Sequence, residues 1–232
     1  MDETLEQAVA LEEEGYAAFK AGDADRSRRL NEESLEIARR LRDPAATVRA
    51  LAGLMRLALR ERDFRTVERL ALECDELAQA HSDPSLRRMP IHMRAEAARM
   101  NGDLDRARSL YDESIALNRD QGNTQMVHVE LANKAWAEIA ASRFNEAEKL
   151  LQESLELAAA DDAYGKAFCL LGTARIELER GRTTGVQTLG RAEQLLAEAG
   201  LVWDPAEEEE HARTASLARV VAGEQAGELR AT

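Results

Sequence analysis

The chain has 232 residues and a formal net charge of −13, with 32% charged, 44% hydrophobic and 4% aromatic residues. This hydrophobic content is too high for a disordered acidic chain, and the excess of carboxylates argues against general binding to nucleic-acid phosphates. The high charge with few aromatics, 13 Gly and 4 Pro is typical of long-helix proteins. No apolar run approaches the length of a membrane span and the first residues are acidic, so we expect a cytoplasmic protein.

Aliphatic residues recur along the chain in three columns with the same register. The steps within each column are 40 residues, except for the last step of 39. Such a period predicts stacked supersecondary units, here five repeats covering about 4–42, 43–82, 83–122, 123–161 and 162–200. The three columns are Leu11, Leu51, Ile91, Leu131 and Leu170; Leu30, Leu70, Leu110, Leu150 and Leu189; and Ile37, Leu77, Leu117, Leu157 and Leu196.

Each repeat predicts two helices separated by a turn. In chain order these helices lie near 4–20, 24–41, 46–61, 64–80, 86–100, 104–119, 126–141, 144–159, 165–180 and 184–199. Turn residues such as Gly22-Asp23 and Gly102-Asp103 place a C′ glycine before an N-cap aspartate. Asp43-Pro44 reads as an N-cap followed by a first helical residue. Residues 201–232 predict a capping helix opened by Asp204-Pro205, with a frayed tail from Gly223.

Small residues at fixed positions give the repeats a family resemblance. Repeat one has Leu11, Gly15, Gly22, Ser27 and Leu35, and repeat three has Ile91, Ala95, Gly102, Ala107 and Ile115. This pattern resembles the tetratricopeptide (TPR) family, although the unit is longer than the usual 34 residues. The stretch from Leu131 to Leu157 is similar to units in helical sensor regions of LuxR-type regulators and signal-transducing ATPases. The resemblance implies an all-α, right-handed α-solenoid whose first helices line the concave face.

The sequence lacks the residue patterns of a catalytic centre. None of its four histidines has a partner at helical metal-binding spacing, and there is no Gly-rich phosphate loop. Cys74 occupies a small-residue column, and no basic residue near Cys169 favours a thiolate. We therefore expect no enzyme activity, no metal and no cofactor.

Basic residues collect on the first helices of repeats two and three, within an acidic protein. Arg49, Arg56 and Arg60 are the only charged residues of 46–60, and their spacing places them on one helical face. In repeat three, Arg99 replaces an apolar residue of its column. One hypothesis makes these arginines an anion-binding cluster in the groove. The competing interpretation, which we weigh slightly higher, pairs them with Glu12, Glu13 and Glu96 and gives only slight stabilisation.

Polar and aromatic residues extend this candidate groove into the later repeats. Trp136 shares a register position with Tyr16, and the resemblance implies that an aromatic there is common packing. His92 and Asn133 lie one turn away from this position. The complete candidate binding set is Arg49, Arg56, Arg60, His92, Glu96, Arg99, Asn133, Trp136 and Arg175.

Three functions fit these observations. The first is a non-catalytic adaptor that holds an acidic or amphipathic segment of a partner protein, and TPR resemblance favours it. The second is a regulatory module that binds a small anionic effector in the same groove. The third is an enzyme or enzyme accessory with a site in the curved pocket. The sequence predicts no nucleic-acid or membrane partner and leaves a homodimer open.

Overall fold

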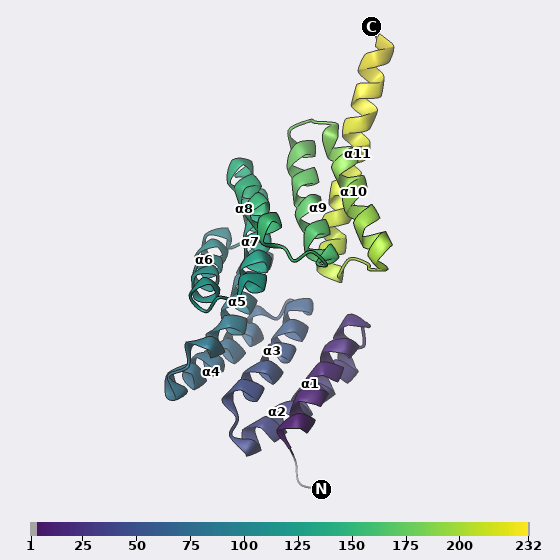
Figure 1. The fold of residues 1–232 in the computed structure, drawn as a ribbon. Coiled ribbons are helices and arrows are strands. Elements are labelled where there is room, and N and C mark those ends of the chain that lie inside the picture. The colour runs from purple at the N-terminus through teal and green to yellow at the C-terminus, as the bar shows by residue number, and fades with distance from the viewer. Residues whose placement is uncertain (1–3, 232) are drawn as a thin grey trace. The chain divides into compact units, whose positions relative to one another are not determined.

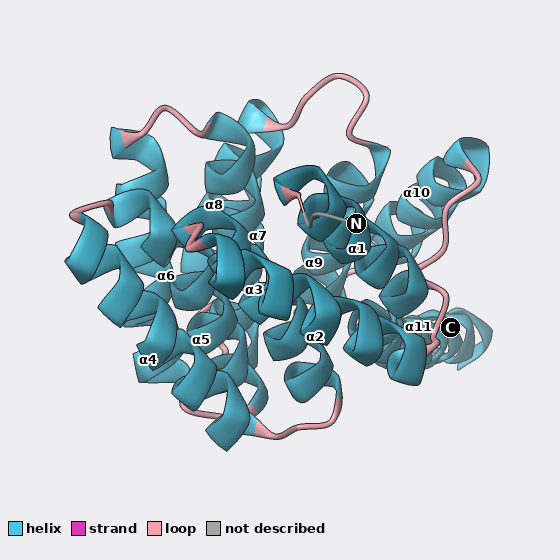
Figure 2. Ribbon diagram, turned by 90° about the horizontal axis from the view of Figure 1, so that it is seen from below, coloured by secondary structure: helices cyan, strands magenta, loops and turns pink. Residues whose placement is uncertain are grey.

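The protein is built from helices alone over the part that the structure describes. The computed structural model covers the backbone of residues 4–231 and the side chains of 4–204 and 207–223. Over this range it contains eleven α-helices, one short 3-10 helix and no strand (Figure 2). The predicted all-α class is confirmed.

The chain forms two compact units, Met1–Gln121 and Gly122–Thr232. The boundary between them lies one residue before the expected junction of repeats three and four. The helices of the first unit are α1 (Leu5–Lys20), α2 (Ala24–Leu41), α3 (Pro44–Arg60), α4 (Phe64–His81), η1 (Pro84–Arg87), α5 (Arg88–Met100) and α6 (Leu104–Asp120). Those of the second unit are α7 (Thr124–Ala140), α8 (Phe144–Leu157), α9 (Ala163–Glu179), α10 (Thr184–Ala199) and α11 (Pro205–Ala231).

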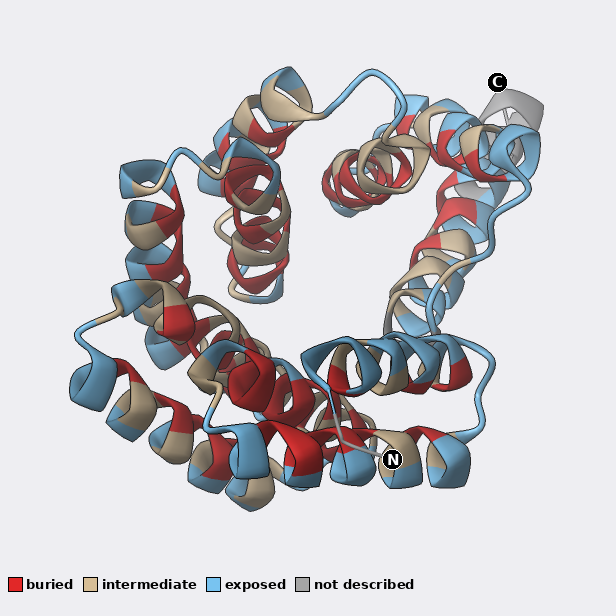
Figure 3. Ribbon diagram, turned by 60° about the horizontal axis from the view of Figure 1, so that its bottom comes forward, coloured by how far each residue is buried: buried red, intermediate tan, exposed pale blue. Residues whose placement is uncertain are grey.

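Within each unit, helices that follow one another in sequence pack together. In the first unit α1 packs on α2 and on α3, and α5 packs on α6; in the second, α7 packs on α8 and α9 on α10 (Figure 1). The last helix, α11, packs on α9 and α10 and continues beyond Gly223, where we expected the chain to fray. Buried residues lie where neighbouring helices face each other (Figure 3). This sequential packing is that of an all-helical repeat protein.

The hydrogen bonds of the turns repeat with the predicted register. The backbone N–H groups of Asp23, Asp63 and Asp103 donate to the carbonyls of Ala18, Ala58 and Ala98, at 2.8–2.9 Å. Each step between these bonds is 40 residues. A side-chain bond also recurs: the hydroxyl of Ser34 donates to Ala8 O at 2.7 Å, and that of Ser154 to His128 O at 2.9 Å. Ser34 and Ser154 are 120 residues apart, and so are Ala8 and His128. This separation equals three repeats.

The ends of the repeat helices lie within two residues of the expected bounds, and several helices begin after a predicted capping aspartate. Asp23, Asp43 and Asp162 each accept a bond from a first-turn N–H through their side chains. The first helix of repeat three was expected near 86–100. Residues 84–87 instead form a 3-10 turn, and the α-helix begins at Arg88. This start places Pro90 in the first helical turn, where its missing N–H would have had no partner.

One asparagine fills the space between α1, α2 and α3 at two glycines. Asn31 of α2 is 1% exposed and donates to Ser27 O at 2.8 Å. A Cβ atom at Gly15 of α1 would lie 2.6 Å from Asn31 Nδ2, and one at Gly53 of α3 would lie 1.8 Å from Asn31 Oδ1. Only glycine at these two positions leaves room for the amide, so Asn31 fixes the approach of three helices.

No helix among the described residues is long and apolar enough to cross a membrane.

Candidate functional site

Two arginines of α3, Arg56 and Arg60, contact α1. Arg56 Nη1 lies 3.7 Å from Glu12 Oε1, and the Arg56 guanidinium lies 4.8 Å from the centre of the Tyr16 ring. Lys20 Nζ is 4.7 Å from the same ring, which is 40% exposed. We call Glu12, Tyr16, Lys20, Arg56 and Arg60 the Tyr16 surface. It has three cations and one carboxylate.

Arg49 and Arg60 of α3 differ in their surroundings. Arg60 donates to Phe19 O at 2.7 Å, and its guanidinium lies 3.9 Å from the Phe19 ring centre. These contacts make Arg60 part of the α1–α3 packing. Arg49, in contrast, is exposed on α3. The pairing of Arg56 with Glu12 matches the interpretation that we weighed higher from the sequence.

Arg99 is held within a buried network rather than projecting as an open anion-binding group. It donates to Glu96 Oε2 at 2.7 Å, and the Tyr111 hydroxyl from α6 donates to the same carboxylate. Glu96 and Arg99 side chains are 14% and 15% exposed. Burial by itself would raise the pKa of Glu96, but Arg99, His92 and Tyr111 lower it below the usual value. The residue that interrupts the apolar column therefore has a compensating partner one turn away.

Of the other sequence candidates, His92 is half-buried on α5, and the remaining three lie in the second unit. Trp136 is 3% exposed and stacks on Phe168 of α9, with ring centres 5.5 Å apart. This agrees with the expected packing role. Arg175 donates to Glu179 at 2.8 Å and lies 3.7 Å from Glu210 of α11. Asn133 is half-buried on α7. These residues belong to the second unit, whereas the candidates on α3 and α5 belong to the first.

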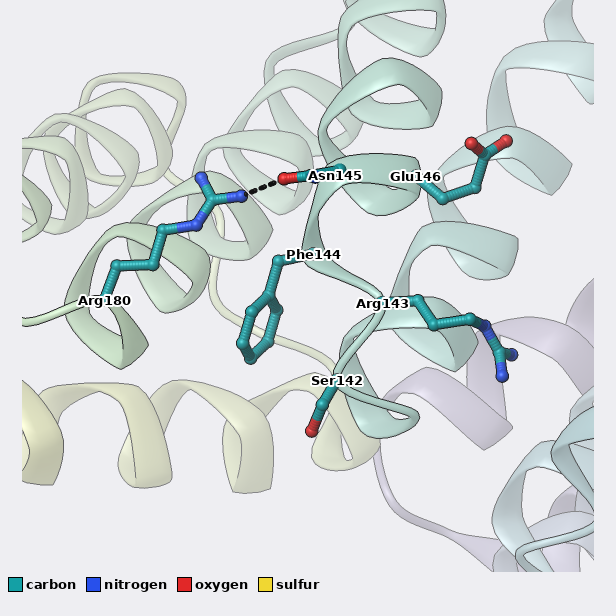
Figure 4. A pocket seen from close by; sticks show the side chains of 6 residues that line it. All are labelled: Ser142, Arg143, Phe144, Asn145, Glu146 and Arg180. Carbon is teal, nitrogen blue, oxygen red and sulfur yellow. Dashed lines mark hydrogen bonds between the residues drawn. The ribbon is translucent and has the colours of Figure 1, made fainter.

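A shallow hollow of about 390 Å³ lies at the start of α8, lined by residues 142–146 and Arg180 (Figure 4). Arg180 donates to Asn145 Oδ1 at 2.7 Å and to Glu148 Oε1 at 2.5 Å. Arg143 extends away from Arg180, on the other side of the turn (Figure 4). It donates to Glu138. The two guanidinium groups thus point apart, and each is held by a carboxylate.

The sequence analysis missed a buried polar group that joins three helices. His128 Nδ1 lies 2.7 Å from Ser154 Oγ and 2.8 Å from Ser154 O, while Nε2 lies 3.2 Å from Asp162 Oδ2. Ser154 Oγ is also 3.2 Å from Cys169 Sγ. A Cβ at Gly165 would lie 2.2 Å from Nε2, so glycine permits this approach of α9 to the imidazole. Ser154 lies two repeats after Cys74 in the same small-residue column, and this was the sequence signal at the group, because His128 has no motif around it.

These residue types are those of a nucleophilic triad, but their burial gives them a structural role. His128 and Ser154 are both 0% exposed, so a substrate cannot reach the hydroxyl in this arrangement. Burial raises the pKa of Asp162, but bonds from the Gly165 N–H and Gln125, together with His128, lower it below the usual value. An ionised carboxylate therefore faces the imidazole, and the group ties α7, α8 and the start of α9 together.

Both cysteines are free and buried. Burial raises the pKa of the Cys74 thiol to about 12, aided by Glu73 and Asp75. Burial likewise raises the pKa of Cys169 to about 11, against the lowering effect of the Ser154 hydroxyl. Neither thiol has the thiolate character of a nucleophile. Among the described residues, no three His, Cys, Asp or Glu side chains are placed to hold a metal ion.

Comparison with known proteins identifies no family for this chain. No protein-family model matches the chain, and no curated protein matches it as a relative.

Proposed function

We propose that this chain is a TPR-like, non-catalytic helical scaffold that binds an acidic or amphipathic segment of a partner protein. The observation that carries the proposal is the Tyr16 ring, which is 40% exposed with Lys20 and Arg56 against it. Aromatic and arginine side chains are enriched among the residues that dominate binding energy at protein interfaces. This surface lies on α1 and α3, the first helices of repeats one and two.

The charge of the Tyr16 surface favours an anionic partner. Its three cations outnumber the one carboxylate, Glu12, in a chain whose formal net charge is −13. A local positive patch on a negative protein attracts carboxylates to one place and repels them elsewhere. An acidic segment with one apolar side chain would use Lys20 and Arg56 for its carboxylates and the Tyr16 ring for its apolar contact.

The test uses a fluorescein-labelled amphipathic peptide of Leu and Glu, with binding measured by fluorescence anisotropy. Lys20→Glu should raise the Kd about fivefold or more, because it replaces an attraction with a repulsion. Lys149→Glu is the matched control: it makes the same charge change at a side chain that is 75% exposed in the second unit. Equal weakening by both variants, or no binding by the unmodified protein, would refute the proposal.

A small anionic effector is the second candidate for the same surface. It is favoured by the size of the cluster, in which Lys20 and Arg56 share one ring. Calorimetric titration with citrate separates the two functions. Citrate binding that Lys20→Glu abolishes, in a protein that does not bind the Leu/Glu peptide, would replace the scaffold proposal with a sensor.

A further inference from the structure

The second unit has an apolar groove that none of the sequence candidates lines. It lies between α10 and α11, which are neighbours in the fold (Figure 1), and has a volume of about 540 Å³. Its apolar lining includes Leu196, Leu201, Val202 and Trp203, and its polar lining includes Glu193 and Glu208. We call it the Val202 groove.

Two apolar residues of the lining are exposed to solvent. Val202 is 82% exposed and Leu201 is 43% exposed. Both lie in the connection that precedes α11, before the Asp204-Pro205 start of that helix. Burying a Val or Leu side chain that is otherwise exposed contributes favourably to folding or binding. These two residues contribute little to the fold as they stand, so an occupant of the groove would gain their burial.

The floor of the groove is fixed by contacts that do not involve Val202. Trp203 meets Tyr164 edge to face, with ring centres 5.9 Å apart, and stacks on His211 of α11 at 5.8 Å. His211 Nε2 lies 2.7 Å from Glu193 Oε1 of α10. The Tyr164 hydroxyl accepts a bond from Asp204 N at 2.9 Å. These contacts hold the connection against α9, α10 and α11, so the groove is a formed surface.

The charge at the groove identifies the chemistry of its occupant. Its lining has two carboxylates, Glu193 and Glu208, and no Lys or Arg. The next two glutamates on α11, Glu209 and Glu210, are paired with Arg213 at 3.4 and 3.0 Å. Glu208, in contrast, lines the groove together with the exposed Val202. A carboxylate beside an apolar surface complements a cation beside an apolar side chain.

From this charge complementarity we propose that the Val202 groove docks a basic, amphipathic segment of a partner protein. An apolar side chain of that segment packs on Val202, Leu201 and Trp203, and a neighbouring Lys or Arg pairs with Glu208. This surface is independent of the Tyr16 surface: it belongs to the other unit and selects the opposite charge.

The probe is a fluorescein-labelled amphipathic peptide of Leu and Arg, measured by anisotropy against its Leu/Glu counterpart. Glu208→Arg should raise the Kd for the Leu/Arg peptide about fivefold. Glu209→Arg is the matched control, because it changes the same residue type one position along the same helix and shifts the net charge equally. The control should change the Kd by less than about twofold, since Glu209 does not line the groove and its carboxylate is paired with Arg213.

A second pair of variants tests the apolar contact. Val202→Ser should weaken peptide binding, whereas Val220→Ser, at an α11 side chain that is 52% exposed and outside the groove, should not. Equal effects of Glu208→Arg and Glu209→Arg would show general attraction to an acidic protein and overturn the proposal. Absence of binding by the Leu/Arg peptide would overturn it as well.

Two further outcomes distinguish this proposal from a homodimer and from the scaffold proposal at the Tyr16 surface. Sedimentation that reveals a dimer, dissociated by Val202→Ser, would make a second copy of the chain the occupant and overturn the partner assignment. Lys20→Glu should leave Leu/Arg binding unchanged. If Lys20→Glu also fails to weaken Leu/Glu binding while Glu208→Arg weakens Leu/Arg binding, the scaffold proposal fails at the Tyr16 surface and the Val202 groove stands.

Discussion

Replacing Gly53 with alanine should reveal how tightly the first unit depends on one asparagine. The new Cβ would lie 1.8 Å from Asn31 Oδ1 and 2.4 Å from Asn31 Cγ. Asn31 cannot simply swing away, because its Nδ2 donates to Ser27 O and Gly15 of α1 closes the other side. The substitution therefore forces either the amide or the two helices to move.

The magnitude follows from opposing contributions to the free energy of unfolding. Alanine gains about 1 kcal/mol over glycine in a helix interior. Overpacking costs about 1–3 kcal/mol, and loss of the Asn31 hydrogen bond costs about 1 kcal/mol more. The net destabilisation is about 1–3 kcal/mol. In an Asn31→Ala background the clash is absent, so Gly53→Ala should stabilise the protein by about 1 kcal/mol.

Urea denaturation followed by far-UV circular dichroism measures each corner of this double-mutant cycle. Gly190→Ala provides the control, because a Cβ at this exposed position of α10 meets nothing within 4 Å and should stabilise by about 1 kcal/mol. If Gly53→Ala costs the same with and without Asn31, the close approach does not depend on that amide. If Gly53→Ala stabilises the unmodified protein as Gly190→Ala does, the packing argument is refuted.

Three further predictions concern the buried charges and thiols. Arg99→Met should lower the free energy of unfolding, measured in urea, by about 3–5 kcal/mol, because it leaves Glu96 buried without its cation. Arg49→Met, at an exposed site, should change the free energy of unfolding by less than about 0.5 kcal/mol. The folded pKa of Glu96 is lowered, so its carboxylate contributes to the free energy of unfolding above the usual carboxyl pKa, and this contribution is lost as pH falls through the lower folded value. The difference in unfolding free energy between the unmodified protein and Glu96→Gln should therefore narrow in acid. A difference that stays constant with pH would contradict this. Cys74 and Cys169, with pKa values raised to about 12 and about 11, should resist a disulfide reagent at neutral pH until urea unfolds the chain, so rapid labelling of the native protein would show that a thiol is accessible.

The sequence determined the helical class, the register and most helix boundaries. These properties depend on local chemistry, namely aliphatic residues at a fixed period, left-handed turns at Gly22 and Gly102, and aspartate side chains that accept first-turn N–H bonds. Local chemistry also explains the late start of α5 at Arg88, because this start places Pro90 in the first helical turn. The repeat pattern by itself predicted an earlier start.

The tertiary structure decided which charges and polar groups have partners. The sequence placed Arg99 in an apolar column, but only packing of α5 on α6 brings the Tyr111 hydroxyl to the carboxylate of Glu96 that Arg99 binds. His128 and Asp162 meet across helices, and Val202 and Glu208 line one groove without any sequence periodicity. Periodicity specifies which face a residue occupies, whereas the distance between two side chains depends on how closely their backbones approach. In this protein that approach depends on glycines such as Gly53 and Gly165, where a single missing Cβ makes room for a polar side chain.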